Sequence, residues 1–389
     1  MKRLRVLQVL EATGGGTRRH LREIFTQLSE DEFEFSLVCA TRREPTMLDD
    51  CRLFRELGVG VEIVDMVRRP APLLDIRAAL ALRARIRRNP VDLVHLHSSK
   101  AGFVGRLATL NLDVPVIYSP HGFPFLQPGW IGRASLMAEK ALAFRADRLV
   151  AVSRAEGRLA VTSGLFQPES VTVVENAVER RIPTSDAPNR GRGLSFGFLG
   201  ELREQKDPLT FVRAARAALT RGLRARFVMP RRGGQLGAIE REIARLDLGG
   251  FFDLVPADDS LDNVHQRCDL GVLPSRWEGL PYALLDSMAM GKPVITSSLD
   301  VFRDVVEPIE PALVFDTGNV DSLASCLLHW QAARPQLRAS VARAVTRFVA
   351  RAHTMSNWSR RLRDVYYDVA GATARPSRAE RSAPLAITG

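Results

Sequence analysis

The sequence lacks a long apolar run. A membrane-spanning helix needs about 20 consecutive residues of mainly apolar character, and the apolar runs in these 389 residues are interrupted well before that length. The amino-terminal stretch Met1–Leu10 begins with basic side chains, as a signal peptide does, but its apolar part is short and contains Gln8. We therefore expect a first β-strand at this position and a protein of the cytoplasm.

Cysteine and paired aspartate are also scarce. The four cysteines, Cys39, Cys51, Cys268 and Cys326, are not spaced like metal ligands. In a reducing compartment such cysteines remain thiols. The sequence has no Asp-x-Asp pair that would hold a divalent metal. We therefore expect neither a metal site nor another bound cofactor.

Charge of one sign is in excess, because 55 lysines and arginines stand against 44 acidic residues and give a formal net charge of +11. Such an excess attracts phospholipid headgroups, nucleotide phosphates or nucleic acid. Aromatic residues make up 7% of the chain and are not interleaved with the basic segments, so we expect no nucleic-acid partner. Hydrophobic content of 46% is ordinary for a globular protein, and the length suits about two domains.

The first half of the chain alternates between patterns typical of strands and helices. Expected strands are Arg5–Leu10, Glu34–Ala40, Val59–Val64, Val91–His97, Val114–Ser119, Arg148–Ser153 and Val171–Val174. Expected helices are Arg18–Leu28, Met47–Leu57, Leu73–Arg88, Lys100–Leu110 and Ser135–Phe144. Alternation of this kind indicates a parallel sheet that is covered by helices on both faces.

A polar segment rich in glycine and proline divides the chain, and we place a linker at residues 186–193. Residues 1–185 then form one domain and residues 194–345 a second, followed by a helical segment at 346–370 and a disordered basic tail at 371–389. The second domain repeats the pattern of strands and helices. Its expected strands include Leu194–Leu199, Ala225–Met229 and Phe252–Val255, and its expected helices include Pro208–Thr220, Leu236–Leu246 and Val320–Ala333. The expected fold class is α/β, with two Rossmann-like, doubly wound domains that face a cleft.

Ligands bind such sheets beyond the carboxyl ends of the strands, where His121, Asn176 and Glu278 are all expected to lie. A glycine loop, Gly14, Gly15 and Gly16, also joins a strand to a helix. The loop either faces a ligand or forms a tight turn that requires unusual dihedral angles, and the sequence leaves both interpretations open.

The stretch Trp277–Ile295 has the most informative pattern. After a strand at Leu270–Leu273, Pro281 suits the first position of a helix and Gly291 suits a left-handed cap at its end. Free N–H groups at the start of such a helix suit a phosphate. Glu278 in the loop and Asp286 in the helix suit the hydroxyls of a sugar or ribose. The pattern therefore predicts a site for a nucleotide sugar.

The same residues resemble a known family. Glu278-Gly279-Leu280-Pro281 with an acid eight positions after Glu278, followed by Met288-Ala289-Met290-Gly291-Lys292-Pro293-Val294, resembles the signature of the family 4 retaining glycosyltransferases, also called glycosyl transferases group 1, which have the GT-B fold. Further similar segments are Gly14-Gly15-Gly16 with His20-Leu21, Pro120-His121-Gly122, Val174-Glu175-Asn176-Ala177-Val178, Phe198–Lys206 and Asn357–Tyr366. His95-Leu96-His97-Ser98 with Lys100-Ala101-Gly102 resembles members that build bacterial surface polysaccharides.

The resemblance implies roles for particular residues. It implies catalytic roles for His121, which would contact the transferred sugar, and Glu278, which would hold its hydroxyls. The residues implied to bind the donor are Lys206, Arg203, Gly279, Leu280, Pro281, Asp286 and Asn176. The glycine loop would lie on the acceptor side, and the last helix would return to the first domain.

By the same resemblance, the expected donor is a nucleoside-diphosphate sugar, UDP- or GDP-linked, and the expected acceptor is a lipid-linked saccharide at the inner face of the membrane. The arginine-rich helix expected at Leu73–Arg88 suits an anionic membrane surface, or it is an ordinary crossover helix with a solvated face. Because His95 and His97 alternate along one strand, we expect them on different faces of the sheet, with His97 as the candidate for the cleft.

The sequence also departs from the family pattern. The second acid is Asp286 instead of glutamate, Glu201 stands where an arginine usually contacts the diphosphate, and Pro230–Gly234 alters a glycine turn. Arg203 is the candidate to replace the missing arginine. Two alternatives remain open: a related protein that binds a nucleotide sugar or saccharide without turnover, and a sugar-nucleotide epimerase.

Overall fold

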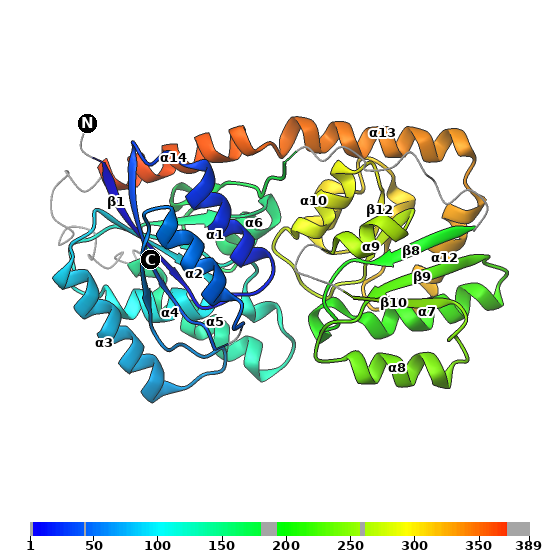
Figure 1. Ribbon diagram of the computed structural model, residues 1–389, viewed down its shortest axis with the longest axis horizontal. Helices are drawn as coiled ribbons and strands as arrows, with labels where there is room; N and C mark the ends of the chain where they lie inside the picture. Colours follow the sequence, from blue (N-terminus) through cyan, green and yellow to red (C-terminus); the bar gives the residue numbers. More distant parts are fainter. Residues whose placement is uncertain (1–2, 43, 180–192, 257–260, 372–389) are drawn as a thin grey trace, which may run out of the picture.

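Two parallel sheets form two domains that lie side by side (Figure 1). The computed structural model describes residues 3–42, 44–179, 193–256 and 261–371. The expected linker and the expected tail therefore fall almost entirely outside the described residues. Helices cover both faces of each sheet. The expected fold class, two Rossmann-like doubly wound α/β domains, is confirmed.

The first sheet has the strand order β3-β2-β1-β4-β5-β6-β7, and every pairing in it is parallel. The strands are β1 (Leu4–Leu10), β2 (Phe33–Cys39), β3 (Gly60–Ile63), β4 (Leu93–His97), β5 (Val116–Ser119), β6 (Arg148–Ala151) and β7 (Val171–Val173). The helices between them are α1 (Gly16–Gln27), α2 (Met47–Glu56), α3 (Pro72–Arg88), α4 (Ser98–Ala108), α5 (Trp130–Leu142) and α6 (Arg154–Thr162), with short 3-10 turns η1 (Pro124–Leu126), η2 (Ala143–Arg145) and η3 (Pro168–Ser170).

The central strand β1 shows how side-chain alternation builds the two layers. Val6 and Leu10 point into the cluster formed with α1, α2 and the last helix, whereas Leu7 and Val9 point into the cluster formed with α3 and α4. Gln8 has the same parity as Val6 and Leu10, and it is completely buried on their side. A polar side chain in such a core requires hydrogen-bond partners.

The second sheet has the strand order β10-β9-β8-β11-β12-β13, again with parallel pairings. Its strands are β8 (Leu194–Phe198), β9 (Ala225–Pro230), β10 (Phe252–Val255), β11 (Leu270–Leu273), β12 (Val294–Ser297) and β13 (Val314–Phe315). Its helices are α7 (Pro208–Thr220), α8 (Leu236–Arg245), α9 (Asp262–Arg267), α10 (Tyr282–Ala289), α11 (Asp300–Val305) and α12 (Val320–Ala332), with η4 (Glu204–Lys206) and η5 (Pro311–Leu313).

Two long helices run along the top of both domains in Figure 1. Helix α13 (Pro335–Ala352) packs on α10 in the second domain, and α14 (Met355–Gly371) packs on α1 in the first. Trp358, Leu362 and Tyr366 of α14 enter the core of the first domain beside Val6 and Leu10 of β1. The end of the chain thus contributes to the core on which the amino-terminal strand lies. Among the described residues, no helix combines the length and the apolar character that crossing a membrane requires.

The largest differences from the expected elements are found in three helices and at the start of a fourth. Helices α6, α9 and α11 have no counterpart among the expected elements, and α5 begins at Trp130 instead of Ser135. Pro281 lies one position before α10, with extended backbone, so Tyr282 is the first helical residue and the expectation for Pro281 is wrong by one position. Gly291 has the expected left-handed conformation, with φ of 74°.

Candidate active site

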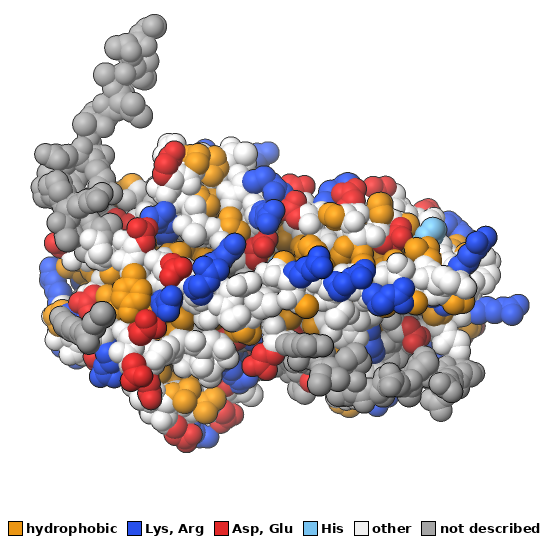
Figure 2. Space-filling model, turned by 90° about the horizontal axis from the view of Figure 1, so that it is seen from above, with side chains coloured by type: hydrophobic (Ala, Val, Ile, Leu, Met, Phe, Trp, Pro, Cys, Tyr) orange, Lys and Arg blue, Asp and Glu red, His pale blue; other side chains and the backbone are white. Residues whose placement is uncertain are grey.

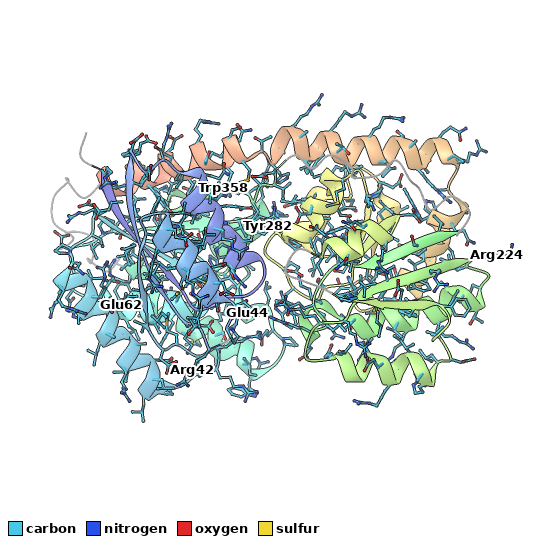
Figure 3. All side chains as sticks on the ribbon, viewed as in Figure 1. Arg42, Glu44, Glu62, Arg224, Tyr282 and Trp358 are labelled. Atoms are coloured by element: carbon cyan, nitrogen blue, oxygen red, sulfur yellow. The ribbon has the colours of Figure 1, made fainter. Side chains whose placement is uncertain are left out.

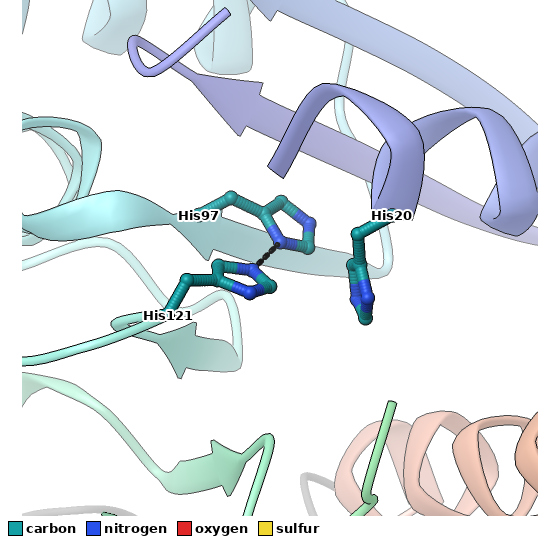
Figure 4. A group of neighbouring side chains, drawn as sticks. All are labelled: His20, His97 and His121. Atoms are coloured by element: carbon teal, nitrogen blue, oxygen red, sulfur yellow. Dashed lines mark hydrogen bonds between the residues drawn. The ribbon is translucent and has the colours of Figure 1, made fainter. Parts of the chain in front are cut away.

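A group of histidines lies where β4 and β5 end. His97 is the last residue of β4, His121 follows β5, and His20 lies in the second turn of α1. Figure 4 shows the three rings together. Taking one nitrogen from each ring, these nitrogens lie within 4.8 Å of one another. His121 has φ of 55° and Ser98, directly after His97, has φ of 72°. A non-glycine residue in this region costs free energy and is found most often at functional sites, so the backbone favours the assignment of a site here.

His95 and His97 lie on the same side of the sheet, because residues two apart on a strand share a face. Their ring centroids are 3.9 Å apart. The expectation that they point to different faces was therefore wrong. Both rings are buried, and burial lowers their pKa values well below the ordinary value for histidine.

A chain of hydrogen bonds begins behind these rings at a backbone carbonyl. The hydroxyl of Ser119 donates to the carbonyl oxygen of Val150 at 2.9 Å. Because that hydroxyl has a single proton, Ser119 must accept from Nε2 of His95, which lies 2.9 Å away. In a neutral imidazole the other nitrogen is then an acceptor. Nδ1 of His95 therefore accepts from the hydroxyl of Tyr366 at 2.8 Å.

The same assignment of donors and acceptors extends the hydrogen-bond chain to His121, the catalytic candidate. The Tyr366 oxygen accepts from the side-chain amide of Gln8 at 3.0 Å, which leaves the carbonyl oxygen of Gln8 to accept from Nε2 of His97 at 2.7 Å. Nδ1 of His97 then accepts from Nε2 of His121 at 3.1 Å, the bond drawn in Figure 4. His121 is likewise neutral, because burial lowers its pKa well below the ordinary value. Its protonated nitrogen is thus Nε2, and its Nδ1 is an acceptor.

The backbone next to His121 is held by a buried acid. One carboxylate oxygen of Glu156 accepts from the N–H of Gly122 at 2.6 Å, and the other accepts from the N–H of Val152 at 2.7 Å. Burial raises the pKa of Glu156 to about 7. The acid connects the turn that carries His121 to the start of α6, so it fixes the backbone at the site.

Three histidines at this spacing could also be considered as metal ligands. In this arrangement, however, Nδ1 of His97 and Nε2 of His121 are engaged with each other, and Nδ1 of His20 lies 3.3 Å from the hydroxyl of Tyr282. Burial lowers the pKa of His20 to about 4, so this ring is neutral as well. We therefore describe the group as a hydrogen-bonded cluster of neutral rings.

The loops expected to bind the donor meet opposite this cluster. Glu278 follows β11, Lys206 ends the turn after β8, and their charged atoms are 2.5 Å apart. The Glu278 side chain is 6% exposed. Gln205 donates to the carbonyl of Trp277 at 2.9 Å and so ties the two loops together. A cation for phosphate and a carboxylate for hydroxyls are therefore adjacent.

The unusual residue Glu201 is paired with two arginines. Its carboxylate forms ion pairs with Arg203 and, at 3.8 Å, with Arg232, which also contacts Glu44 of the first domain at 3.0 Å. Glu44 lies at the junction of the domains (Figure 3). Arg203 thus compensates the charge of Glu201 in this arrangement, and Arg232 adds a cation that the sequence pattern alone did not assign to the site.

The two domains touch at the site. A Cβ atom placed on Gly279 would lie 3.1 Å from the backbone nitrogen of Gly122, so only glycine allows this approach without displacement. The side chain of Asn176 donates to the carbonyl of Leu280 at 2.7 Å. The backbone carbonyl oxygen of Asn176 in turn accepts from Nδ1 of His353, between α13 and α14, at 2.9 Å. Asn176 therefore ties the donor loop to the first domain.

Asp286 and the glycine loop also meet across the junction. Asp286 accepts from Arg19 of α1 at 2.6 Å, so a ribose would have to share this carboxylate with the guanidinium or replace it. Gly15, with φ of 64°, precedes α1, and a Cβ atom on Gly16 would lie 3.2 Å from the ring of Tyr282. Tyr282 lies between the domains in Figure 3 and donates to Glu23 of α1 at 2.5 Å.

Sequence reasoning missed several of these residues as members of the site. Gln8, Arg19, Glu156, Tyr282 and Tyr366 are all buried or partly buried polar residues with partners at the site. Gln8 had a detectable signal, since it interrupts the otherwise apolar run Val6–Leu10 of its strand. The others become visible only when α1, α6, α10 and α14 are placed in space.

Comparison with protein families identifies both halves of the chain. The Glycosyl transferase 4-like domain matches residues 15–177, and the Glycosyl transferases group 1 domain matches residues 193–332. The Escherichia coli UDP-Gal:alpha-D-GlcNAc-diphosphoundecaprenol alpha-1,3-galactosyltransferase is 25% identical over 83% of this chain and 86% of its own. The D-inositol 3-phosphate glycosyltransferase of Acidothermus cellulolyticus is 28% identical over 87% of this chain and 82% of its own.

Solved structures show the same fold. Sucrose-phosphate synthase from Thermosynechococcus elongatus superposes with a TM-score of 0.79 at 15% identity, covering 95% of this chain and 100% of its own. Anabaena HepE, in complex with UDP and glucose, superposes with a TM-score of 0.76 at 16% identity, covering 94% of this chain and 100% of its own. With both family domains in order along one chain, and with this fold, the protein belongs to the group 1, family 4-like glycosyltransferases of GT-B fold.

Proposed function

We propose that the protein transfers a sugar from a nucleoside-diphosphate sugar, UDP- or GDP-linked, to a saccharide acceptor, with retention of configuration and without a metal ion. The observation that carries this proposal is the partly buried ion pair of Lys206 and Glu278. It lies next to Gly279, whose backbone meets the backbone of His121 and Gly122 across the domain junction. The pair offers a positive charge and a hydroxyl acceptor side by side. A sugar diphosphate has the complementary groups side by side: an anionic diphosphate for Lys206 and sugar hydroxyls for Glu278.

Lys206 is the group proposed to stabilise the leaving diphosphate. Breaking the bond between the anomeric carbon and the diphosphate builds negative charge on the leaving group, and fixed cations or helix amides lower the barrier. Lys206 is 19% exposed and is held by Glu278, so its position is defined before the donor binds. The start of α10 at Tyr282 would supply backbone N–H groups near the same place. This set of donors makes a metal unnecessary.

His121 is proposed to contact the transferred sugar through Nδ1. Because His121 is neutral and protonated on Nε2, its Nδ1 can accept a hydrogen bond from a sugar hydroxyl. A neutral acceptor of this kind orients the sugar and does not need to remove a proton. Glu278 would hold further hydroxyls of the same sugar.

The acceptor is proposed to be a lipid-linked saccharide in the synthesis of a surface polysaccharide. The Escherichia coli relative is named for UDP-Gal as donor and for an acceptor on diphosphoundecaprenol. The Anabaena neighbour was solved with UDP-glucose as well as with UDP. Both names support a UDP-linked donor.

The experiment is a transfer assay with a panel of UDP- and GDP-sugars and with undecaprenyl-diphosphate saccharides as acceptors. We expect one donor to be used, the product to keep the anomeric configuration of that donor by NMR, and activity to persist in excess chelator. Loss of activity with chelator that is restored by a divalent metal would contradict metal independence. Inversion at the anomeric carbon would contradict the retaining mechanism.

A further inference from the structure

Helix α5 presents its apolar side to solvent. Trp130 and Met137 of α5 and Phe144 of the next turn, η2, are spaced at seven residues and are 77%, 67% and 70% exposed. The inward-facing side of the same helix contains the buried acid Glu139. A helix on a soluble protein normally has the reverse pattern, with large apolar side chains inside and charges outside. Exposed apolar residues in such a row mark an interaction surface.

Helix α3 has the same feature on the same side of the sheet. Leu73, Ile76 and Leu80 follow helical spacing and are 81%, 53% and 60% exposed. The contacts α3 with α4 and α4 with α5 place the two exposed rows on either side of α4. Figure 1 shows the three helices together along the lower side of the first domain, away from α14. The two rows therefore belong to one face of the domain.

The exposed charges on these two helices have one sign. Arg77, Arg87, Arg88, Arg133 and Lys140 are exposed. The acids of α3 and α5 are buried instead. Asp75 pairs with Lys100 at 2.7 Å, and Glu139 pairs with Arg106 at 2.7 Å. Large apolar side chains between cations, on helices without an exposed acid, are complementary to anionic headgroups over acyl chains.

We propose that the solvent-facing sides of α3 and α5 form the docking surface of this protein for a bilayer that contains anionic phospholipid. The surface lies on the domain that carries His121, and a short segment after His121 leads directly into α5 at Trp130. Docking would therefore hold His121 close to the membrane. Docking would serve catalysis only if the acceptor is lipid-linked, so this part of the inference rests on the proposed function. Binding to vesicles itself needs neither donor nor acceptor. The two proposals can therefore fail separately.

A second cationic surface provides the control. Arg343, Arg347 and Arg351 are exposed along α13, and Figure 2 shows basic side chains in a row along this helix. The row lacks the large exposed aromatic side chains of α5, so charge alone would have to bind a membrane there. If net charge were sufficient, the α13 row would contribute as much as α5.

The test is co-sedimentation of the full chain with vesicles of phosphatidylglycerol and phosphatidylcholine, and with vesicles of phosphatidylcholine alone. We expect binding to the first kind only, with a blue shift of tryptophan fluorescence that is lost in Trp130→Phe. The triple variant W130S, M137S and F144S should bind about tenfold more weakly or worse. The paired variant R133E and K140E should also weaken binding.

The matched controls are F251S with L337S, which changes apolar residues that are 41% and 38% exposed elsewhere, and R343E with R347E on α13. Both should bind vesicles like the wild type, and melting temperatures should show that all variants fold. The proposal is overturned if the α5 variants bind as well as the wild type or if only the α13 variant loses binding. It is also overturned if the protein is a dimer that the α5 variants convert to a monomer, because the face would then bind a second copy.

Discussion

Nε2 of His121 lies 3.1 Å from Nδ1 of His97, and this contact is the last link of a hydrogen-bond chain that starts at the carbonyl of Val150. A carbonyl can only accept, so it sets the direction of every following bond. The chain passes through Tyr366, which α14 contributes from the far end of the sequence. The last helix therefore fixes which nitrogen of the catalytic candidate carries the proton.

Tyr366→Phe should interrupt this chain. Phenylalanine cannot donate to Nδ1 of His95, so the amide of Gln8 is free to turn over and His121 can take up either tautomer. We expect kcat to fall roughly tenfold, because a loss of orientation at a catalytic group is costly, while KM for the donor changes little. Histidine 15N chemical shifts should show His121 as a mixture of tautomers.

Tyr367→Phe is the matched control, because this neighbouring residue is 45% exposed and takes no part in the hydrogen-bond chain. It should keep the kcat and the histidine spectrum of the wild type. A His121 that stays protonated on Nε2 in Tyr366→Phe, together with an unchanged kcat, would contradict the assignment of the chain.

Lys206→Met, together with a double variant, should distinguish the contribution of the ion pair to stability from its contribution to catalysis. Removing Lys206 from this partly buried pair leaves Glu278 uncompensated and should lower the free energy of unfolding by roughly 1–2 kcal/mol. The double variant K206M and E278Q removes both charges and should recover much of that stability. Activity should nevertheless stay at least about 100-fold below wild type in both variants. Recovery of activity along with stability in the double variant would argue against a chemical role for the pair.

Glu156→Gln should disturb the turn that carries His121. The amide group of glutamine would face the N–H of Gly122 or of Val152 and leave one buried donor without an acceptor. We expect a loss of about 2 kcal/mol in the free energy of unfolding at pH 7.5. A lower kcat should accompany it, because the His121 backbone is displaced. Urea unfolding and steady-state kinetics measure the two effects.

The stability of the wild type relative to Glu156→Gln should depend on pH. The pKa of Glu156 is about 7 in the folded protein and lies near 4.5 when the chain is unfolded. Between these values the folded state binds more protons than the unfolded state, so stability falls as pH rises. The wild type should therefore lose stability relative to the variant between pH 5 and pH 7.5, whereas a constant difference would show that Glu156 titrates normally.

Gly279→Ala should loosen the contact between the domains. The added Cβ would meet the backbone of Gly122 and His121 at 3.1 Å, and backbone cannot rotate away as a side chain can. We expect a fall in kcat of roughly tenfold, since small displacements of catalytic groups are costly. Gly249→Ala, where a Cβ would meet open space, is the control. Equal kinetics for the two variants would refute the contact.

The sequence predicted the fold class and most of the strands and helices, because the hydrophobic periodicity of these segments is clear. Helix α7 (Pro208–Thr220) and strands β10 (Phe252–Val255) and β11 (Leu270–Leu273) have the expected bounds. The short helices α9 and α11 were missed, since six residues carry too little periodicity. Helix α9 has a single apolar residue, and the three apolar residues of α11 fill less than two turns, so packing against the rest of the domain decides the conformation of both.

The candidate site could be predicted only as far as local motifs reach. His121, Glu278 and Lys206 follow strands, so the common edge of a parallel sheet brings each to the site region of its own domain. The pairing of Asp286 with Arg19 depends on how two domains meet, which no local pattern encodes. The contribution of Tyr366 depends in the same way on α14 returning to the first domain.

The central claim is that Glu278 and Lys206 hold the donor for transfer, and release of nucleoside diphosphate tests it most directly. The wild type and Glu278→Gln should each be assayed on the full panel of UDP- and GDP-sugars, with and without acceptor. Their melting temperatures should first be shown to be similar, so that a difference in rate does not reflect unfolding. We predict release from one donor by the wild type and a rate at least about 100-fold lower for the variant. No release from any donor, or equal rates for the two proteins, would contradict the claim.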